Sequence, residues 1–346
     1  MDAILVTKGV NVRYLTGLAS SNAAVLIPAA GPAVLCTDSR YQGTAERGCA
    51  DIELLIERTV DEALIAAALA GGLRAIGFED EHLTVHRHQA LVTRADDAHA
   101  VLVPLGDLVD DLRVIKDEAE LELLTRACEI TGEAFSAVLD RLRPGTTERE
   151  FAVALERVMV DFGAEGTAFD TIVASGPNGA IPHHVPGNRP FEAGDLVTID
   201  CGARYGGYHA DMTRTVAIGQ VATWQRKIYG LVAEAQAAGV AAARIGADVG
   251  DVDGIARDLI AGAGYGEAFS HGLGHGVGLE IHEAPWLGQG KTGTLQDRVP
   301  ITIEPGIYLA GAGGVRIEDT LVVRAGTGAT GSAQSLTTIT RELLVL

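Results

Sequence analysis

The sequence has few cysteines, few aromatic residues and no long apolar run. Its 346 residues include four cysteines (Cys36, Cys49, Cys128 and Cys201), and only 5% are aromatic. Scattered cysteines without a CxxC pair or a dense framework favour reduced thiols and a cytoplasmic location. No apolar run reaches the roughly 18 residues that a membrane-spanning helix needs. The first ten residues lack a basic segment followed by an apolar one, so we expect no secretory signal.

Basic residues are also scarce relative to acidic ones. The chain has 27 lysines and arginines against 46 aspartates and glutamates, a formal net charge of −19 at pH 7. Binding to a nucleic-acid backbone needs a basic surface, so this composition argues against a nucleic-acid partner. Most of the acidic excess is expected to lie on a soluble, self-repelling surface. A handful of acids is nevertheless enough to form a cation-binding site.

The length of the chain favours two domains, because single hydrophobic cores usually stop growing below this size. Within residues 1–112, short apolar runs such as AILVT and AVLIP alternate with helical patterns at 60–72 and 81–93. This alternation predicts a small α/β unit with a covered sheet and no glycine-rich phosphate loop. His82, His86 and His88 lie on the second predicted helix. There a solvated face is favoured over a metal site, because no HExxH arrangement is present.

The character of the sequence changes at about residue 112, where a long charged amphipathic helix is predicted over 112–135. Asp117 or a neighbour is its expected N-cap, and acidic residues fill its first turn. A second helix is predicted to open at Thr147, with Glu150 three residues later as in a capping box, and to run to about Phe162. We therefore divide the chain into domains at 1–112 and 113–346 and expect an α/β (α+β) fold.

Residues 271–283, HGLGHGVGLEIHE, contain three histidines among four glycines. Imidazole is well suited to bind a metal or move a proton near neutral pH, and glycine lets a backbone come close to a ligand. We interpret the stretch as one wall of an active site. His271, His275 and His282 would project from it, and the glycines would leave room for a ligand. Alone, the stretch does not identify a reaction.

Two aspartates stand at the ends of predicted strands. DLVTID is predicted to end at Asp200 and ADMTRTVAIG to begin near Asp211, with a Gly206-Gly207 turn joining the two strands as a hairpin. Paired strand ends can present two carboxylates to one point. For either aspartate alone, capping of a turn is the favoured interpretation.

Two glutamates lie inside otherwise apolar predicted strands, Glu304 in VPITIEPGIYLAG and Glu318 in GGVRIEDTLVV. An acid in a buried strand needs a partner, because an unpaired buried charge is very costly. For Glu318 an ion pair with Arg316 is one explanation, since residues two apart on a strand share a face. The other explanation is a site that all four acids share with a histidine.

Such a site would require cations. At about 4 Å, two like charges repel by about 4 kcal/mol at an effective dielectric constant of 20, so four clustered carboxylates would mostly protonate unless cations compensated them. Two divalent ions would balance the four charges. Carboxylates with one imidazole suit manganese, cobalt, iron or zinc, and the many oxygens argue against a structural zinc site. Two metals about 3.5–4 Å apart are a recurrent hydrolytic device.

Six segments together resemble the pita-bread metallopeptidases, and within them the prolidase and aminopeptidase P group. They run across nearly the whole chain: NVRYLTG at 11–17, ASGPN…IPHH at 174–184, DCGARYGGYHADMTRT at 200–215, HGLGHGVGLEIHEAP at 271–285, TIEPGIY at 302–308 and GGVRIED at 313–319. The resemblance implies a creatinase-like N-terminal α/β domain, a pseudo-symmetric pita-bread catalytic domain and a homodimer.

The resemblance also implies a dinuclear metal site, with manganese as the expected ion and cobalt, zinc or iron as alternatives. Matched residue by residue, the ligands would be Asp200, Asp211, His275, Glu304 and Glu318. Glu304 would in addition serve as the acid/base of the reaction.

Four further residues receive roles from the same resemblance. His183 and His282 would orient the substrate and either carry a proton or stabilise the oxyanion, and His271 would contact the substrate. Arg316 would pair with a ligand carboxylate, as residues behind a metal site commonly do. His184 and His209 are interpreted as bystanders.

The implied reaction is hydrolysis of the Xaa-Pro bond at the N-terminus of dipeptides or short peptides, with a metal-bridging hydroxide attacking the carbonyl. The resemblance does not choose between a dipeptidase and an aminopeptidase acting on longer peptides. A creatinase-type amidinohydrolase and a non-catalytic peptide-binding relative are the alternatives. Either would be expected to lack metal ligands, and all five are present here.

Overall fold

A computed structural model describes residues 1–325 and 331–346, which form two compact units, Met1–Arg113 and Val114–Leu346. The first unit is built on a six-stranded sheet with the order β4-β3-β2-β1-β5-β6. Strands β1–β2 and β2–β3 pair antiparallel, and the other neighbours pair parallel. The elements are β1 (Ala3–Val6), α1 (Gly9–Thr16), β2 (Ala23–Pro28), β3 (Val34–Thr37), α2 (Gln42–Gly48), β4 (Glu53–Ile56), α3 (Val60–Ala70), β5 (Ala75–Phe78), α4 (Val85–Asp97), β6 (Val101–Pro104) and α5 (Leu108–Arg113).

Both faces of this sheet are covered, because successive side chains of a strand point to opposite sides. Leu5 and Leu26 belong to a buried cluster with residues of α3 and α4. Val6 and Val25 belong to a second cluster with residues of α1 and α2. The predicted α/β unit with a covered sheet is confirmed.

Helix α4 begins later than its sequence pattern indicated. Thr84 is the N-cap, and its hydroxyl accepts a hydrogen bond from the backbone N–H of Arg87 at 3.3 Å. The prediction of a helix from residue 81 is therefore wrong at its start, because the capping threonine sets the first turn. His82 lies before the helix, and both His82 and His86 are exposed.

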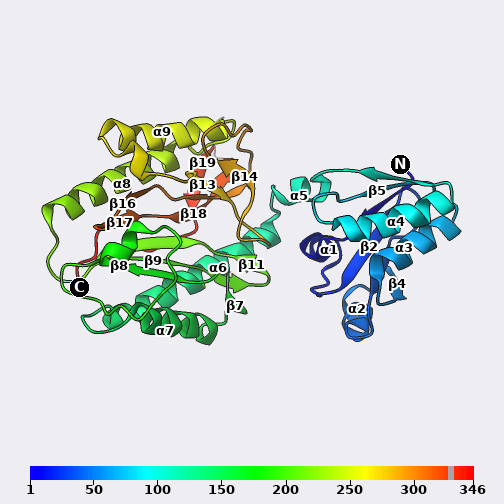
Figure 1. Cartoon of the computed structure of the whole chain (residues 1–346), viewed down its shortest axis with the longest axis horizontal. Helices are drawn as coiled ribbons and strands as arrows, with labels where there is room; N and C mark the ends of the chain where they lie inside the picture. Colours follow the sequence, from blue (N-terminus) through cyan, green and yellow to red (C-terminus); the bar gives the residue numbers. More distant parts are fainter. Residues whose placement is uncertain (326–330) are drawn as a thin grey trace. The chain divides into compact units, whose positions relative to one another are not determined.

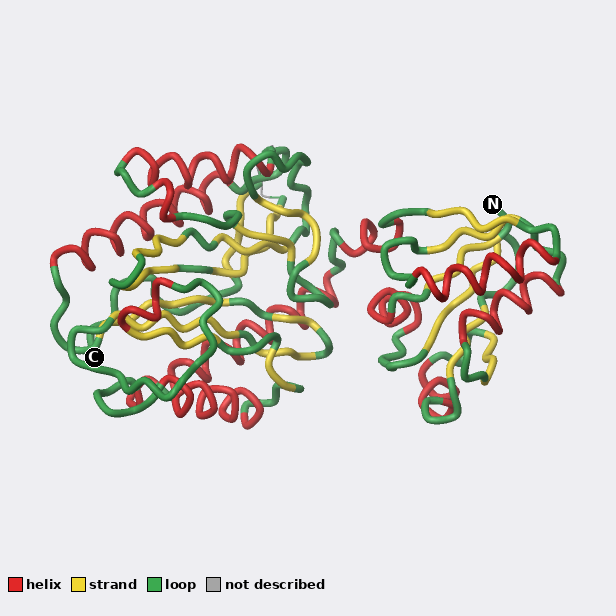
Figure 2. Tube along the Cα trace, in the orientation of Figure 1, coloured by secondary structure: helices red, strands yellow, loops and turns green. Residues whose placement is uncertain are grey.

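In the Val114–Leu346 unit, two pairs of long helices lie on opposite sides of the strands (Figures 1 and 2). Helices α6 (Glu118–Ala137) and α7 (Glu148–Asp161) share a buried cluster with β8, β9 and β12. Helices α8 (Thr223–Ala242) and α9 (Val249–Gly262) share another with β15, β17 and β18. The unit thus has two layered halves with strands between them.

The strands of this unit form one five-stranded sheet and several smaller ones. They are β7 (Gly166–Thr167), β8 (Ile172–Ser175), β9 (Leu196–Cys201), β10 (Ala203–Tyr205), β11 (Tyr208–His209), β12 (Met212–Ala217), β13 (Gly274–Gly276), β14 (Glu283–Leu287), β15 (Pro300–Ile303), β16 (Gly306–Leu309), β17 (Gly313–Arg316), β18 (Asp319–Arg324) and β19 (Ser332–Ser335), with 3-10 turns η1 (Leu139–Arg141), η2 (Gly176–Ala180) and η3 (Gly266–Ala268).

The predicted N-cap at Asp117 and the predicted capping box of Thr147 and Glu150 both form. Asp117 accepts from the backbone N–H of Glu120 at 2.8 Å, and the Glu120 carboxylate accepts from the backbone N–H of Asp117 at 2.7 Å. Thr147 and Glu150 make the same reciprocal pair at the start of α7. These contacts satisfy backbone N–H groups that a first helical turn otherwise leaves unpaired.

The predicted hairpin also forms, in two stages. Strands β9 and β12 pair antiparallel, with Asp200 opposite Thr213, and the chain continues into the short pair β10–β11. Gly206 and Gly207 form the turn with φ of 57° and 87°. Two successive positive φ values suit a tight hairpin turn and favour glycine.

The two strands predicted to contain Glu304 and Glu318 are both broken at the glutamate. The first divides into β15 and β16, and the second into β17 and β18. β15 pairs with β18, whereas β16 pairs with β17 in a separate sheet. Pro305 follows Glu304 and cannot donate to a strand ladder. The expectation of continuous strands is therefore wrong, and each glutamate lies where the chain changes sheets.

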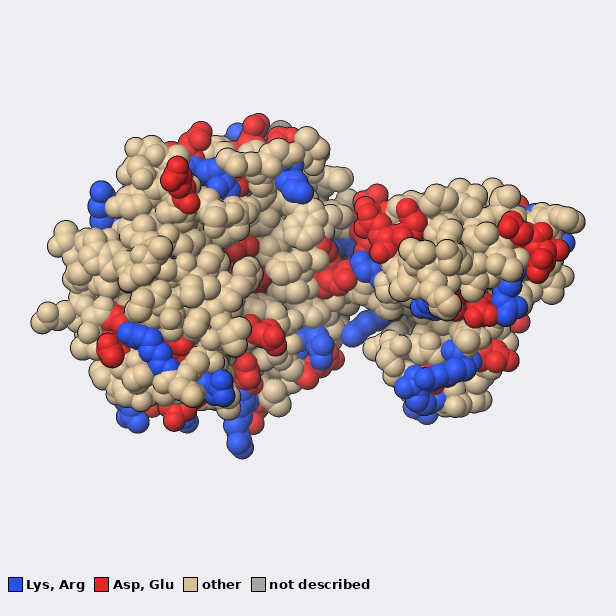
Figure 3. Space-filling model, in the orientation of Figure 1, with Lys and Arg blue, Asp and Glu red and all other residues tan. Residues whose placement is uncertain are grey.

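None of the helices in the described ranges combines the length and the apolar character that crossing a bilayer requires. On the face in view, acidic and basic side chains are scattered over both units (Figure 3).

Candidate metal centre

Three of the predicted ligands converge in the Val114–Leu346 unit. One side-chain ligand atom from each of Asp211, His275 and Glu318 lies within 4.8 Å of the other two. Asp211 immediately precedes β12, His275 lies in β13, and Glu318 lies in the break between β17 and β18. All three residues are buried, with exposed fractions of 5%, 6% and 1%. Sheet pairing therefore brings together positions more than 100 residues apart.

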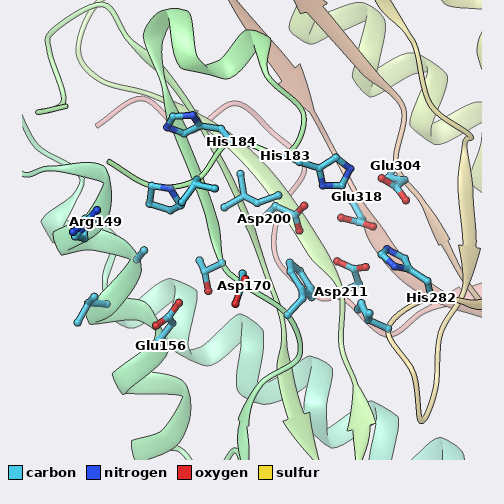
Figure 4. Close-up of a pocket in the computed structure, with 18 of the residues that line it drawn as sticks. Arg149, Glu156, Asp170, His183, His184, Asp200, Asp211, His282, Glu304 and Glu318 are labelled. Atoms are coloured by element: carbon cyan, nitrogen blue, oxygen red, sulfur yellow. The ribbon is translucent and has the colours of Figure 1, made fainter. Parts of the chain in front are cut away.

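Asp200 and Glu304 border this group. The Nε2 atom of His275 lies 3.5 Å from Asp211 Oδ2 and 3.3 Å from Glu304 Oε1. Asp200 is the penultimate residue of β9, and its carboxylate appears beside those of Asp211, Glu304 and Glu318 in Figure 4. The structure thus places all five predicted ligands around one region.

Hydrogen bonds behind the cluster orient its side chains. Nδ1 of His275 lies 2.9 Å from the backbone carbonyl of Gly276, and donation of its proton there leaves Nε2 free to bind a metal. Thr213 donates its hydroxyl to Glu318 at 2.7 Å. Thr302 donates its hydroxyl to Glu304 Oε1 at 3.3 Å.

Arg316 pairs with Asp200 and not with Glu318. Its Nη2 donates to Asp200 Oδ2 at 2.8 Å, and its Nε donates to the hydroxyl of Thr213 at 3.0 Å. The ion pair considered from the sequence between Arg316 and Glu318 is therefore not the one observed. Pairing with a predicted ligand is the arrangement that the family resemblance implied for Arg316.

The clustered carboxylates strongly perturb one another. Burial raises the pKa of Asp211 well above its usual value, and the charges of Glu318 and Asp200 raise it further. Burial and the charges of Glu304 and Asp200 likewise raise the pKa of Glu318. Burial opposes ionisation of Glu304 too, but its hydrogen bond with His275 lowers its pKa to about 2. The protein groups alone therefore do not keep all these acids ionised.

The donor set fits divalent cations. Asp200 Oδ1 is buried and has no hydrogen-bond partner, which leaves a polar atom whose desolvation is uncompensated. Carboxylate oxygens with one imidazole nitrogen suit divalent metal ions such as manganese. A bound cation would satisfy the orphan oxygen and allow the acids with raised pKa values to ionise.

The glycines of the histidine stretch serve the backbone rather than a ligand. A Cβ atom on Gly274 would lie 2.0 Å from the carbonyl oxygen of Thr302, and one on Gly276 would lie 2.1 Å from that of Ala284. These approaches allow β13 to pair closely with its neighbours. The interpretation that the glycines leave room for a ligand is thus wrong at these two positions.

Three predicted substrate-side histidines lie around the cluster. The ring of His282 packs edge-on against that of His275, with centroids 4.4 Å apart. His271 Nε2 lies 2.8 Å from the hydroxyl of Tyr308, which accepts from Arg316 Nη1 at 2.9 Å. His183 lines the cavities on both sides of the cluster. Burial lowers the pKa of His271 and of His282.

Two cavities open from the cluster. One, of about 510 Å³, also contains Phe169, Ile172 and Ile281 (Figure 4). The other, of about 310 Å³, also contains His271, Trp286 and Tyr308. Both are lined by His183, Asp200, His275, His282 and Glu304. A ligand can therefore extend in two directions from the same group of residues.

Tyr308 and Trp286 were not singled out from the sequence. Tyr308 links His271 to Arg316, and it is the last residue of the quoted motif TIEPGIY. The ring of Trp286 lies 6.3 Å from that of His275 and 6.4 Å from that of His282, between centroids. Trp286 directly follows the quoted segment 271–285, and no pattern in the sequence indicated that it contacts the two histidines.

His184 and His209 make contacts away from the cluster. His184 Nε2 lies 2.8 Å from the carboxylate of Glu148, and His209 Nδ1 lies 3.0 Å from the carbonyl of Gly278. Both histidines were interpreted from the sequence as bystanders in catalysis.

Known proteins are similar to this chain in sequence and fold over nearly its full length. A model of metallopeptidase family M24 matches residues 122–325, and one of the creatinase/prolidase N-terminal domain matches residues 1–115. An Xaa-Pro dipeptidase of Pyrococcus horikoshii is 38% identical, over 99% of this chain and 95% of the relative. Among solved structures, an Xaa-Pro dipeptidase from Bacillus anthracis has a TM-score of 0.93 at 37% identity, covering 100% of this chain and 95% of that one. An X-Pro aminopeptidase from Thermotoga maritima has a TM-score of 0.90 at 35% identity, covering 100% and 96%.

Proposed function

The chain belongs to metallopeptidase family M24, and we propose that it hydrolyses the Xaa-Pro bond at the N-terminus of dipeptides or short peptides. It consists of a creatinase/prolidase N-terminal domain followed by a pita-bread metallopeptidase domain. The proposed bond specificity is supported by the relatives named as Xaa-Pro dipeptidases and X-Pro aminopeptidase, which align with this chain almost end to end.

The observation that carries this proposal is the buried group of Asp211, His275 and Glu318 with Asp200 and Glu304 beside it. We propose that these five residues hold two divalent ions, with manganese as the native metal. When bound, such ions supply Lewis acidity and a nucleophilic water at neutral pH. A creatinase-type amidinohydrolase or a non-catalytic relative would not need this complete set of acids.

The chain's own groups supply the proton transfers. The Glu304 carboxylate lines both cavities and lies 3.3 Å from His275 Nε2, so it can accept a proton from a water held at the cluster. Burial lowers the pKa of His282, so its neutral imidazole can donate an N–H hydrogen bond to the developing oxyanion. The proton that Glu304 accepts from water can then pass from Glu304 to the leaving nitrogen. His183 lies in both cavities and is placed to orient the peptide across the cluster.

The larger cavity suits an apolar part of the substrate. Phe169, Ile172 and Ile281 line it together with the acidic group. A proline nitrogen carries no N–H in the peptide bond, so binding of this residue requires no hydrogen-bond acceptor there. An apolar pocket beside the cluster can therefore accept a pyrrolidine ring without leaving a buried donor unpaired.

Two measurements test the proposal. Metal analysis of the purified protein should find about two divalent ions per chain, a stoichiometry expected of a dinuclear hydrolase. With added manganese, an Xaa-Pro dipeptide and an Xaa-Pro-Xaa tripeptide should be cleaved, whereas matched Xaa-Ala peptides should not. The ratio of the two Xaa-Pro rates separates a dipeptidase from an aminopeptidase. Absence of cleavage of both, in protein that contains the metal, would refute the function.

The oligomeric state and the compartment are further proposals. We propose a homodimer, supported by the family resemblance, and light scattering of the purified protein tests it. A cytoplasmic location is supported by the four cysteines, all of which are free and buried.

A further inference from the structure

The two histidines that flank the cluster are each followed by a residue that contacts a buried ionisable side chain. His183 is followed by His184, which contacts Glu148, and His282 is followed by Glu283, which contacts Lys116. We propose that these two pairs are positioning devices that fix His183 and His282 against the metal site. Glu148, His184, Lys116 and Glu283 are then positioning residues. The kinetic part of this inference rests on the proposed function.

Glu148 organises the whole segment that carries His183. Its side chain is fully buried, at 0% exposure. Oε1 accepts from the backbone N–H and hydroxyl of Ser175, at 2.8 and 2.7 Å, and from the amide of Asn178 at 2.9 Å. Oε2 accepts from His184 at 2.8 Å and from the backbone N–H of Gly187 at 3.1 Å. One carboxylate thus binds both ends and the middle of residues 175–187.

The second pair lies under the loop that carries His282. The Lys116 ammonium donates to Glu283 Oε1, and the two side chains are 1% and 8% exposed. The backbone N–H of Lys116 donates to the carbonyl of Arg298 at 3.0 Å, so the lysine itself is fixed. A Cβ atom on Gly278 would lie 2.4 Å from Glu283 Oε1 and 2.8 Å from Lys116 Cε. The loop therefore folds directly over the pair, which explains the glycine at 278.

Both contacts act on the residue next to the histidine, not on the histidine itself. His183 lies in a turn and His282 in a bend directly before β14. Holding His184 and Glu283 in place therefore limits the positions that the adjoining backbone, and with it His183 and His282, can adopt. Figure 4 shows His183 beside the carboxylates and His184 farther along the same segment. For His282, the fixed position includes the edge-on contact with the ligand His275.

The chemistry of these pairs also favours a positioning role over a purely stabilising one. For the Lys116–Glu283 pair, desolvating two charges costs several kcal/mol per ion, and apolar residues of similar volume often give equal or greater stability. Directional contacts from buried charges instead hold a loop in one geometry. Each pair is also attached at the start of a helix, since Glu148 is the first residue of α7 and Lys116 lies two residues before α6. The loops that carry His183 and His282 are therefore attached to the first turns of α7 and α6, or to the residues just before them.

The His184 pair can be tested without removing a buried charge. In His184→Gln the amide nitrogen can replace Nε2 as a donor to Glu148, whereas His184→Phe fills the volume but cannot donate. We expect His184→Phe to lower kcat on an Xaa-Pro dipeptide by about 10- to 100-fold with little change in KM, since small displacements of catalytic groups have effects of this size. His184→Gln should stay within about 2-fold of wild type. Metal content should be unchanged in both.

The Lys116 pair needs a double variant, because Lys116→Met leaves the Glu283 carboxylate buried without its cation and is expected to be strongly destabilised. Lys116→Met combined with Glu283→Leu replaces the whole pair by apolar groups and should retain a near-normal unfolding midpoint. We expect this double variant to show at least a roughly 10-fold lower kcat.

Each helix start offers a matched control. Glu120→Ala and Glu150→Ala remove the capping-box carboxylates of α6 and α7 and weaken the same helical turns. They should cost about 1 kcal/mol of stability, as lost caps typically do, while leaving kcat close to wild type. Equal kcat losses in control and anchor variants would show that only helix stability matters, which would overturn the proposal.

A readout without metal or substrate separates this inference from the proposed function. In metal-free protein, the ring C–H NMR signals of His183 and His282 should be single and sharp. In His184→Phe the signal of His183 should broaden or split, and in the double variant that of His282 should do so. Unchanged signals in either variant would refute that anchor, whether or not Xaa-Pro bonds are the substrate.

Discussion

Replacing Asp211 by asparagine should change stability in opposite directions with and without metal. Without metal, the Asp211 carboxylate faces that of Glu318, whose ligand atom lies within 4.8 Å. Two charges at that distance repel by about 3 kcal/mol at an effective dielectric constant of 20. Partial protonation relieves some of this, so Asp211→Asn should stabilise the metal-free protein by about 1–3 kcal/mol near pH 7.

The same reasoning sets the pH dependence of the metal-free wild type. The pKa values of Asp211 and Glu318 are raised in the folded state above their ordinary values of 3.8 and 4.5. The folded protein therefore holds protons that the unfolded chain releases. Their contribution favours folding below the unfolded-state pKa values and is lost as the pH rises through the folded-state values. The advantage of Asp211→Asn in metal-free protein should accordingly shrink between pH 7 and pH 5.

With manganese, the order should reverse. A ligand present at 100 times its Kd stabilises the folded state by about 2.7 kcal/mol. Asp211→Asn removes one of the atoms that would bind the ion and should lose most of this gain. Both tryptophans, Trp224 and Trp286, lie in the Val114–Leu346 unit, so tryptophan fluorescence during urea unfolding reports on that unit alone.

Asp319 provides the matched control, because it is buried beside Glu318 but is paired with Arg214 and Arg341. Asp319→Asn should destabilise the unit by about 3–5 kcal/mol with or without manganese, since it breaks a buried ion pair. If Asp211→Asn behaved like this control and was destabilised equally in chelator and in manganese, Asp211 would be a structural acceptor. The assignment of the cluster as a metal centre would then fail.

Three further outcomes follow from the same geometry. Glu304→Gln should lower kcat on an Xaa-Pro dipeptide by about 10²- to 10⁴-fold, the usual contribution of an acid/base group, and steady-state kinetics at saturating manganese measures it. Arg316→Lys cannot keep its bonds to Asp200, Thr213 and Tyr308 together, so titration calorimetry should show about 10- to 100-fold weaker manganese binding. Tyr308→Phe should cost about 1 kcal/mol in urea unfolding and lower kcat without changing metal content; a lower metal content would place Tyr308 among the groups that hold the ion.

Local features of the chain were predictable from its residues. The N-cap at Asp117, the capping box at Thr147 and the Gly206-Gly207 turn depend on a few adjacent residues, and they formed as predicted. The acids of the cluster could also be recognised in the sequence, because they lie in or at the ends of predicted apolar strands, where burial of an unpaired carboxylate is energetically unfavourable. The family resemblance then named His275 among the histidines of 271–283.

Contacts between distant segments were not predictable in this way. The pattern of VPITIEPGIYLAG indicated one strand, but the chain leaves one sheet for another at Glu304. The hydrophobic periodicity of a strand indicates which of its side chains share a face, but it does not indicate which other strand it pairs with. For the same reason, Arg316 could be matched with Glu318 two residues away, whereas sheet pairing places it against Asp200.

The sequence by itself determined the composition of the site, namely which acids and histidines are available and which short turns and caps present them. The tertiary structure alone decided their partners. Strand pairing set the distances between Asp211, His275 and Glu318. Burial raised the pKa values of the two acids, whereas for His275 burial is outweighed by the Glu304 carboxylate, which raises its pKa. The tertiary structure also joined His184 to Glu148 and Glu283 to Lys116 across 36 and 167 residues. Such contacts arise from the packing of whole layers, which no local pattern of residues specifies.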